Sequence, residues 1–198
     1  MSMQSRAEET HQRILDAALD AFARQGYDAA GVAEICEQAG VTKGGFYHHF
    51  HSKQDLFLEL LERWLKGIDT QMTAARAGAR TVPEALLIMT GMIQRVFREA
   101  GGRLPLFLEF VTQAAHSQVF FQATAVPIRR YLAFFADMMA TGAAEGSMRP
   151  VEPEIGGRVL VAFAMGLLVM GLVDPLSADW GEVAREGVQL FLAGLTPV

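Results

Sequence analysis

The segment that most limits what this chain can fold into is VTKGGFYHHFHSK, residues 41–53. It contains no acidic residue, whereas acidic residues outnumber basic ones over the whole chain. Thr42 can cap a helix by accepting a hydrogen bond from a backbone N–H two or three residues later, so a helix should begin directly after it. Gly44 and Gly45 would then leave the N–H groups of the first turn uncovered. We therefore expect a short helix whose positive end is open to an anion such as a phosphate.

The two faces of this helix are expected to differ. Phe46 and Phe50 are four residues apart and share one face, while Gly45, His48 and His49 point largely away from it. The pattern predicts that one face is buried and that the other is offered to a partner.

The neighbouring sequence predicts a helix-turn-helix unit. A capping box at 5–8 opens a helical repeat that Gly26 should end, and a second, shorter repeat covers 32–39. Residues 40–42 form the turn between this repeat and the segment above, and a second capping box at 52–55 opens the next helix. The shared core is expected to contain Phe22, Ile35, Val41, Phe46 and Phe50.

Five motifs within this unit keep a characteristic order and spacing: Gly26-Tyr27, VAEI at 32–35, AGVTKGGFYHHF at 39–50, Ser52-Lys53 and Leu56-Phe57. Over roughly residues 8 to 60 the chain resembles the N-terminal domain of the TetR family of bacterial transcriptional regulators. The resemblance implies that Tyr47 and Lys53 contact phosphates, and that Lys43, Gly45 and His48 lie nearest the base edges. The expected DNA-binding residues are Gly31, Thr42, Lys43, Gly44, Gly45, Tyr47, His48, His49 and Lys53.

The chain departs from the family pattern just before the second helix. Family members usually carry Thr or Ser there, where the hydroxyl caps the helix and touches a phosphate, but this sequence has Ala30-Gly31. Glycine is a tolerable cap that costs only about a few tenths of a kcal/mol. The hydroxyl contact with DNA is nevertheless lost.

Composition limits the class of partner. The chain has 198 residues, 51% hydrophobic content and a net charge of −5. This is enough apolar material for one or two domains, but an evenly acidic chain would not be a general nucleic-acid binder. Residues 1–66 also hold more Asp and Glu than Lys and Arg. Any DNA contact must therefore come from a local patch with modest non-specific affinity.

The sequence favours a cytoplasmic protein without a membrane partner. The single cysteine, Cys36, excludes an internal disulfide and a cysteine-based zinc site, and it suits a reducing compartment. Residues 1–12 are polar and charged and show no secretion leader. The longest apolar run, 159–173, is shorter than a bilayer-spanning helix, so we expect a buried or interface helix.

The remainder of the chain predicts further helices, about nine in all. Pro, Gly and capping residues separate apolar repeats at 56–65, 81–97, 104–115, 127–146, 154–173 and 178–194. The expected fold is all-α, with a three-helix helix-turn-helix domain at 1–52 joined to a helical ligand-binding and dimerisation domain at 53–198.

The repeat at 154–173 is apolar nearly all round, and such a helix must be covered on every side. In a chain this short the simplest cover is a second copy of the chain, which agrees with the dimer of the last two helices that the resemblance implies. The expected interface residues are Val159, Phe163, Val169, Trp180, Val183, Gly187, Leu190 and Phe191.

Methionine and phenylalanine cluster in residues 86–170. They could form only a core, yet ten Met with several Phe make a wall that adapts to apolar shapes, and the resemblance places an inducer pocket among these helices. The candidate effector-binding residues are Phe107, Glu109, Phe110, Gln113, Phe134, Met138, Phe163 and Leu167. Glu109, joined by Gln113, would be the polar group of that pocket, unless it lies on a surface face of its helix.

Two other features allow alternative interpretations. His48 and His51 are three residues apart and could suggest a metal, but no carboxylate or thiolate supplies a third ligand, so we expect no metal and no cofactor. Cys36 could be a redox sensor, although its place on the apolar face of its helix favours a small buried thiol.

These features predict a homodimeric transcriptional regulator, a repressor, that binds a pseudo-palindromic double-stranded DNA operator and is released by a small hydrophobic or aromatic effector. An alternative is a helical small-molecule-binding or partner-binding dimer with weak or lost DNA binding. An enzyme is disfavoured, because no catalytic triad order, carboxylate pair or phosphate loop stands out.

Overall fold

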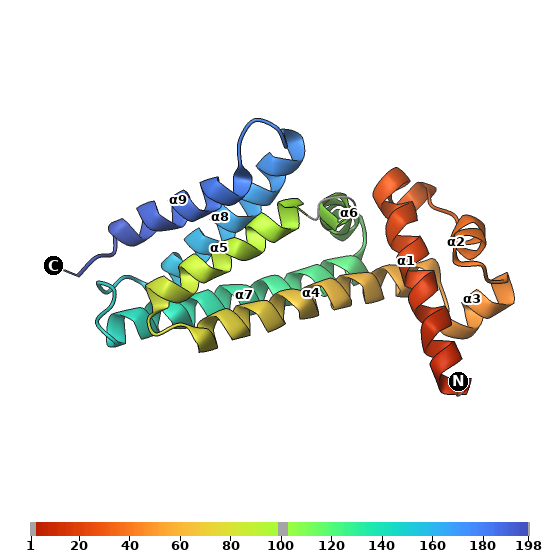
Figure 1. Ribbon diagram of the computed structural model, residues 1–198, viewed down its shortest axis with the longest axis horizontal. Helices are drawn as coiled ribbons and strands as arrows, with labels where there is room; N and C mark the ends of the chain where they lie inside the picture. The colour runs from red at the N-terminus through yellow and green to blue at the C-terminus, as the bar shows by residue number, and fades with distance from the viewer. Residues whose placement is uncertain (1–2, 99–102, 198) are drawn as a thin grey trace. The chain divides into compact units, whose positions relative to one another are not determined.

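The computed structural model describes residues 3–98 and 103–197, and every regular element in these ranges is an α-helix (Figure 1). The helices are α1 (Met3–Ala29), α2 (Val32–Ala39), α3 (Lys43–His49), α4 (Lys53–Gly78), α5 (Val82–Arg98), α6 (Arg103–His116), α7 (Gln118–Ala144), α8 (Pro153–Val173) and α9 (Trp180–Ala193). The predicted all-α class is confirmed, with nine helices in the described ranges.

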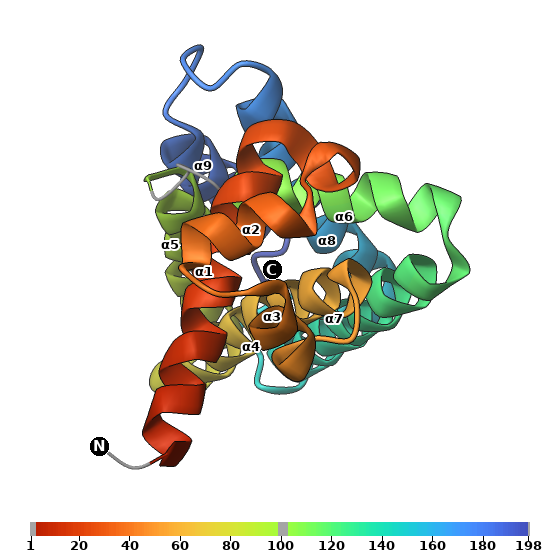
Figure 2. The ribbon, with the colours of Figure 1, turned by 90° about the vertical axis from the view of Figure 1, so that its right-hand side faces the viewer.

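The chain divides into two compact units. The first contains α1, α2, α3, α4 as far as Leu65, α6, and α7 as far as Phe121. The second contains the rest of α4 and α7 together with α5, α8 and α9. In Figures 1 and 2 the helices α1, α2 and α3 form one group, coloured red to orange. The predicted domain boundary between residues 52 and 53 stays a prediction.

Aromatic rings hold the first unit together around Phe57 of α4. Its ring centroid lies 5.1 Å from that of Phe22, 4.6 Å from Tyr27, 4.2 Å from Phe110 and 5.5 Å from Phe120. Such edge-to-face and tilted pairs stabilise a core beyond the area that they bury. Because two of these rings come from α6 and α7, helices distant in sequence complete the core under the helix-turn-helix.

The sequence predicted that Gly26 would end the first helix, and α1 is broken at this residue. Gly26 has φ 81° and ψ 168°, which interrupts the helix, but a further turn follows as far as Ala29. Only glycine adopts this conformation at low cost, so the interruption itself follows from the sequence. The predicted break at Gly26 is therefore confirmed, with one further helical turn beyond it.

The second unit packs through close contacts between helix backbones. A Cβ atom at Gly157 of α8 would lie 2.8 Å from the backbone N of Ala136 and 2.9 Å from the carbonyl O of Leu132, both in α7. Helices α5 and α9 also lie side by side, and a Cβ atom at Gly181 of α9 would lie 2.5 Å from the side chain of Gln94 on α5. The buried core of this unit contains Met72, Val82, Leu86, Met89, Met138, Met139, Met148, Leu160, Val188 and Leu195.

Helix α8 is longer than the apolar run in the sequence suggested. It begins at Pro153 and has 21 residues, so by length and composition alone it could cross a membrane, the one such helix in the described ranges. The helix predicted at 154–173 is confirmed, and its role as a buried or interface helix stays a prediction. Core helices of soluble proteins meet the same test, and 33% of its most apolar stretch is buried inside the chain.

Candidate nucleic-acid interface

The turn between α2 and α3 is built from backbone hydrogen bonds that glycine makes possible. Gly40 has φ 64° and ψ 40°, the left-handed conformation that commonly ends a helix. Its N–H donates to Glu37 O (3.1 Å), and the N–H of Val41 donates to Cys36 O (2.9 Å). The last carbonyls of α2 are thereby satisfied, and the chain turns directly into α3.

The predicted caps of α3 and α4 are confirmed, whereas the capping box predicted at 5–8 is wrong because α1 already begins at Met3. Thr42 Oγ1 accepts a hydrogen bond from the N–H of Gly45 at 3.0 Å, so α3 begins at Lys43 as expected. Ser52 Oγ accepts from the N–H of Asp55 at 3.0 Å and caps α4. These caps fix where the short helix α3 starts and where it gives way to α4.

Helix α3 has the two different faces that the sequence predicted. Phe46 and Phe50 are buried, with 0% and 2% exposure. Lys43 and His48 are exposed, and Tyr47 is 52% exposed with its ring edge against Phe46. The buried face anchors the helix, so the opposite face is held in a defined orientation.

The fold does not require the two glycines in the first turn of α3. A Cβ atom at Gly44 would lie no closer than 3.8 Å to any neighbouring side chain, and one at Gly45 no closer than 3.5 Å, both to Thr42 Oγ1. These are ordinary van der Waals distances. Because glycine costs helix stability without a packing reason here, its use points to an approach from outside the chain.

Gly31 caps α2 without a side-chain hydrogen bond. It has φ −89° and ψ 144°, an extended conformation open to any residue, and a Cβ atom there would meet nothing within 4 Å. A hydroxyl-bearing residue would therefore fit at this position without any rearrangement.

Lys53 is bound within the chain. Its Nζ donates to the carbonyl oxygens of Tyr27 (2.7 Å), Asp28 (3.3 Å) and Ala30 (3.1 Å), and it lies 4.4 Å from the centre of the Tyr27 ring. An ammonium group has three N–H donors, so all of them are committed. Lys53 thus closes the C-terminal end of α1, and its predicted phosphate contact stays a prediction that would require at least one of these bonds to break.

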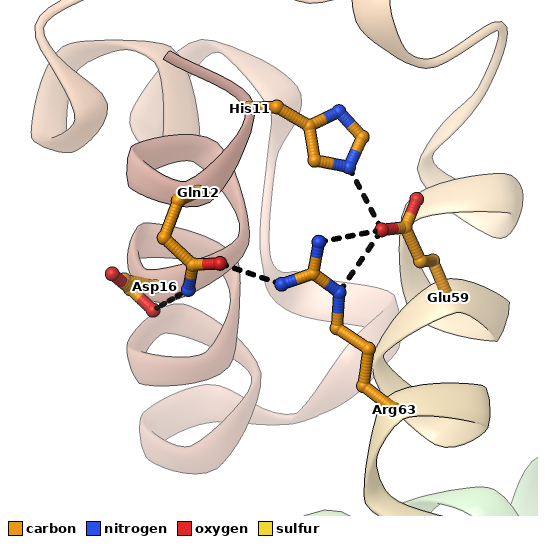
Figure 3. A network of polar contacts seen from close by, with 5 residues as sticks. All are labelled: His11, Gln12, Asp16, Glu59 and Arg63. Carbon is orange, nitrogen blue, oxygen red and sulfur yellow. Dashed lines mark hydrogen bonds and ion pairs between the residues drawn. The ribbon is translucent and has the colours of Figure 1, made fainter. Parts of the chain in front are cut away.

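A polar network that the sequence did not reveal joins α1 to α4 (Figure 3). Glu59 Oε1 lies 2.8 Å from His11 Nε2 and accepts from Arg63 Nε at 3.1 Å. Another Arg63 nitrogen donates to Gln12 Oε1 at 2.6 Å, and Gln12 donates in turn to Asp16 at 2.7 Å. His11 and Glu59 are 48 positions apart, so no local spacing could have indicated the pair.

His49 is less available to a partner than expected. It is only partly exposed, and its ring centroid lies 5.6 Å from that of His11 and 5.3 Å from that of His48. Burial lowers the pKa of His49, and the neighbouring His11 and His48 lower it further. This side chain therefore stays neutral at neutral pH, whereas His48 is exposed as expected.

Cys36 is a buried thiol, as its place on an apolar helix face predicted. Burial raises its pKa, with Lys43 acting weakly in the opposite direction, so the thiol remains protonated. In residues 3–98 and 103–197, no three His, Cys, Asp or Glu side chains are grouped so that they could hold a metal ion.

The candidate effector-binding residues do not fall in one place. Glu109, Phe110 and Gln113 belong to the first unit, where Gln113 Nε2 donates to Glu109 Oε1 (3.1 Å) and to Asp28 Oδ2 (3.4 Å). Glu109 is therefore neither fully exposed nor set in the methionine-rich core. Phe134, Met138, Phe163 and Leu167 belong to the second unit, and the side chain of Phe107 lies outside the described part of the structure.

The candidate dimer residues divide into exposed and packed groups. Val159, Val169, Val183 and Leu190 are exposed apolar side chains on α8 and α9. Phe163 instead packs into the space at Gly187, where a Cβ atom would lie 2.2 Å from its ring. Trp180 Nε1 donates to Asp174 O at 3.0 Å, and Phe191 is partly buried.

Comparison with known proteins finds the same arrangement elsewhere. Residues 14–60 match the family described as bacterial regulatory proteins, tetR family. The chain is 50% identical over 56 residues to the transcriptional regulator AcrR of Shigella flexneri, and 25% identical over 187 residues to the A-factor receptor protein of Streptomyces griseus. The structure of SCO4454, a TetR-family transcriptional regulator from Streptomyces coelicolor, superposes with a TM-score of 0.82 at 25% identity.

The coverage of these matches differs. The AcrR match spans 28% of this chain and 26% of AcrR, which confines it to one domain. The A-factor receptor match spans 93% of this chain and 63% of the receptor. The superposition on the Streptomyces coelicolor structure covers 95% of this chain and 96% of the other, so the whole fold is shared.

Proposed function

This chain belongs to the TetR family of bacterial regulatory proteins, and we propose that it is a cytoplasmic transcriptional repressor that binds an operator as a homodimer and releases it when a small effector binds. We propose no enzymatic activity. The observation that carries the DNA-binding part is the outward face of α3. It is free of acidic side chains and keeps Gly44 and Gly45 where the fold leaves room for larger residues.

In this proposal α3 enters the major groove. The uncovered N–H groups in its first turn and the Lys43 ammonium bind a phosphate or a base edge. Tyr47 contacts a neighbouring phosphate. No arginine on α3 is available for the common paired contact with guanine, so Lys43 takes that part and DNA shape supplies further selectivity. Gly31, Thr42 and His48 are proposed to flank this contact, and His49 to act from behind His48.

The homodimer is proposed to form through α8 and α9. Exposed apolar residues of α8 are Ile155, Val159, Val169, Met170 and Val173. Ile155 and Val159 are four residues apart and Met170 and Val173 three apart, which puts the members of each pair on one side of the helix. Val183 and Leu190 extend this face on α9. An apolar face of this extent on a soluble chain marks an interaction site, and a second copy offers the matching face.

A dimer test follows from this face. Val159→Asp combined with Val169→Asp should give a monomer in sedimentation velocity experiments, because each charge would be buried unpaired in the interface. Ile88→Asp, at an exposed apolar position on α5, is the control and should remain dimeric. A double variant that stays dimeric would contradict the proposed interface.

The effector is proposed to bind in the second unit and to be largely apolar. Phe134, Met138, Phe163 and Leu167 supply apolar surface there. The hydroxyl group of Thr124 on α7 is buried and makes no hydrogen bond with any residue in 3–98 and 103–197, and the buried hydroxyl of Tyr131, two turns along, lies beside Arg130 and Asp69. Buried polar groups without partners are costly, so a ligand oxygen that satisfies them would gain affinity.

Tyr131 would act as a donor to such a ligand. Burial, followed by the nearby carboxylate of Asp69, raises its pKa to about 12, so the phenol keeps its proton at neutral pH. An effector that carries a carbonyl or hydroxyl oxygen fits this site better than a pure hydrocarbon. Tyr131→Phe should weaken its binding and leave operator affinity unchanged without effector.

Release of DNA needs only unequal effector affinity for the two states of the dimer. A coupling free energy of about 1–3 kcal/mol is typical of such systems. The dimer must present its two copies of α3 about 34–36 Å apart, or at a multiple of that distance, to reach successive major grooves. An effector that changes this separation lowers operator affinity.

The test of function is fluorescence anisotropy with a duplex that the purified protein selects from a random-sequence pool. Tight binding that survives unlabelled competitor is expected. Lys43→Ala should weaken binding and reduce the slope of log Kd against log salt by about 1, since one cation is removed. Tyr47→Ala should weaken binding to all sequences. Failure to select any duplex would contradict the proposal.

A second function is favoured by Gly31 and the acidic composition, namely a helical dimer that binds a small molecule or protein partner and binds DNA weakly or not at all. Intact ligand binding in a protein that selects no duplex would support it.

A further inference from the structure

His11 on α1 touches two other helices at once. Its Nε2 lies 2.8 Å from Glu59 Oε1 on α4. The face of its ring stacks on Phe50, the residue that ends α3, with the ring centroids 4.6 Å apart and the planes 26° apart. The rings of His11 and His49 form a T-shaped pair with their centroids 5.6 Å apart. One side chain thus connects α4 with the end of the proposed recognition helix.

The charged groups around His11 come from all three helices. Helix α4 supplies Glu59 and Arg63, whose guanidinium shares the same carboxylate oxygen (Figure 3). Helix α3 supplies His49 and, behind it, His48. From α1 itself, Asp16 reaches the network through Gln12.

The position of the exchangeable protons follows from this geometry. A carboxylate only accepts hydrogen bonds, so neutral His11 must carry its proton on Nε2 and donate it to Glu59. A second proton, taken from solvent, would add at Nδ1. His49 is the poorer site for that proton, because burial and then its two histidine neighbours lower its pKa. Glu59 Oε1 lies 2.8 Å from His11 Nε2, so a positive charge on the His11 ring would face a carboxylate.

Protonation would strengthen both contacts of His11. The hydrogen bond to Glu59 becomes charge-assisted, which makes it shorter and stronger. The stacking on Phe50 becomes a cation–π contact. Both changes hold the end of α3 more firmly against α4, which continues as one helix into the second unit.

We propose that His11 is a positioning residue that holds α3 against α4, and that operator binding takes up one proton at His11. This inference rests on the proposed DNA-binding function. DNA would bring a high density of negative charge to α3. This charge favours a positive charge on His11, which packs against the end of that helix. The affinity for the operator should therefore rise as pH falls through the range in which histidine titrates.

The experiment measures Kd for the selected duplex between about pH 6 and pH 8 at constant ionic strength, the range in which histidine changes charge. Because one pKa unit of difference between free and bound states corresponds to about a tenfold change, wild-type Kd should fall by up to about tenfold towards pH 6. His11→Gln, whose amide can still donate to Glu59, should bind within about twofold of wild type at pH 8 and lose most of this slope.

Control variants separate His11 from general effects of histidine protonation near DNA. His116→Gln, an exposed position on α6, should keep the full slope. Glu59→Gln should lose it, because the carboxylate that stabilises the imidazolium is gone. A slope that disappears in His48→Gln and persists in His11→Gln would overturn the proposal.

A double-mutant cycle tests whether the role is only structural. The coupling between His11→Gln and Glu59→Gln is the factor by which the Kd of the double variant deviates from the product of the two single effects. This factor should be several times larger at pH 6 than at pH 8. Equal coupling at both pH values would mean that no proton is involved. Wild-type selection of a duplex tests the function alone, so an unchanged slope in His11→Gln would reject this inference and leave the function standing. Circular dichroism at each pH confirms that each variant is folded.

Discussion

Glycine is used for opposite reasons in α3 of the first unit and α8 of the second. At Gly44 and Gly45 of α3 a Cβ atom would have ordinary contacts, at 3.8 and 3.5 Å. At Gly157 of α8 it would strike the backbone of α7 at 2.8 Å. The packing of α8 needs its glycine, whereas the packing of α3 does not. A glycine without a role in the fold is the better indicator of an external partner.

The same contrast applies to two lysines that the sequence placed together in the DNA contact. The ammonium of Lys53 is fully engaged by three carbonyl oxygens of its own chain. Lys43, at the start of α3, is exposed. Lys53 therefore stabilises the unit that carries the proposed DNA-binding face, and Lys43 is an exposed cation on that face for which a DNA contact is proposed.

The largest expected effect is that of Gly157→Ala. The new methyl group would force α7 and α8 apart, because backbone atoms cannot move aside as a flexible side chain can. We expect the free energy of unfolding to fall by about 2–3 kcal/mol, measured by urea denaturation. Gly67→Ala on α4, where a Cβ atom would meet nothing within 4 Å, is the control. It should gain up to about 1 kcal/mol from helix propensity. If both substitutions changed the free energy of unfolding equally, packing would not require a glycine at position 157.

Next in size is Lys53→Met, which keeps the apolar stem and removes the ammonium. Loss of the three hydrogen bonds at the end of α1 should lower the free energy of unfolding by about 1–2 kcal/mol. Lys43→Met should leave stability within about 0.5 kcal/mol and weaken operator binding. If Lys53→Met were as stable as wild type while losing operator affinity, Lys53 would be a DNA contact after all.

Gly45→Ala should separate stability from binding. Helix propensity should raise the free energy of unfolding by up to about 1 kcal/mol, since the fold has room for the methyl group. Operator affinity should fall by about tenfold, or 1.4 kcal/mol, because the methyl group meets the approaching DNA. Thermal unfolding and anisotropy measure the two quantities. Unchanged affinity would show that this glycine does not mark a contact.

The smallest effect is expected from Gly31→Ser. The hydroxyl would accept a hydrogen bond from a free N–H of α2 and raise the free energy of unfolding by a few tenths of a kcal/mol, with about a twofold gain in operator affinity from a phosphate contact. Gly31→Ala provides the matched variant without the hydroxyl. If Gly31→Ser and Gly31→Ala raised the free energy of unfolding equally, the gain would come from the backbone and not from a capping hydrogen bond.

The sequence allowed most of the helix-turn-helix to be predicted. The start of α3 after Thr42, its buried Phe46 and Phe50, and the cap at Ser52 all follow from hydrogen bonds and periodicity within a few residues. The break of α1 at Gly26 was predicted as well, but not the further turn that follows as far as Ala29. Local rules identify such a break but do not say whether the helix resumes after it.

The grouping of distant segments could not be predicted in this way. Phe110 and Phe120 complete the first core, so Glu109 and Gln113 lie beside Asp28 instead of joining the methionine-rich second core. Helix propensity and hydrophobic periodicity describe each helix alone. They do not specify which of several apolar faces meet.

By itself, the sequence determined the all-α class, the turn at Gly40, the caps of α3 and α4, and the resemblance to the TetR family over the helix-turn-helix. These depend on interactions between residues close together in the chain. The tertiary structure alone decided that Lys53 closes α1, that Gly157 admits the backbone of α7, and that His11 pairs with Glu59 from 48 positions away. Each of these depends on how whole helices pack, because a side chain's partners are set by the neighbouring helix that packing brings to it.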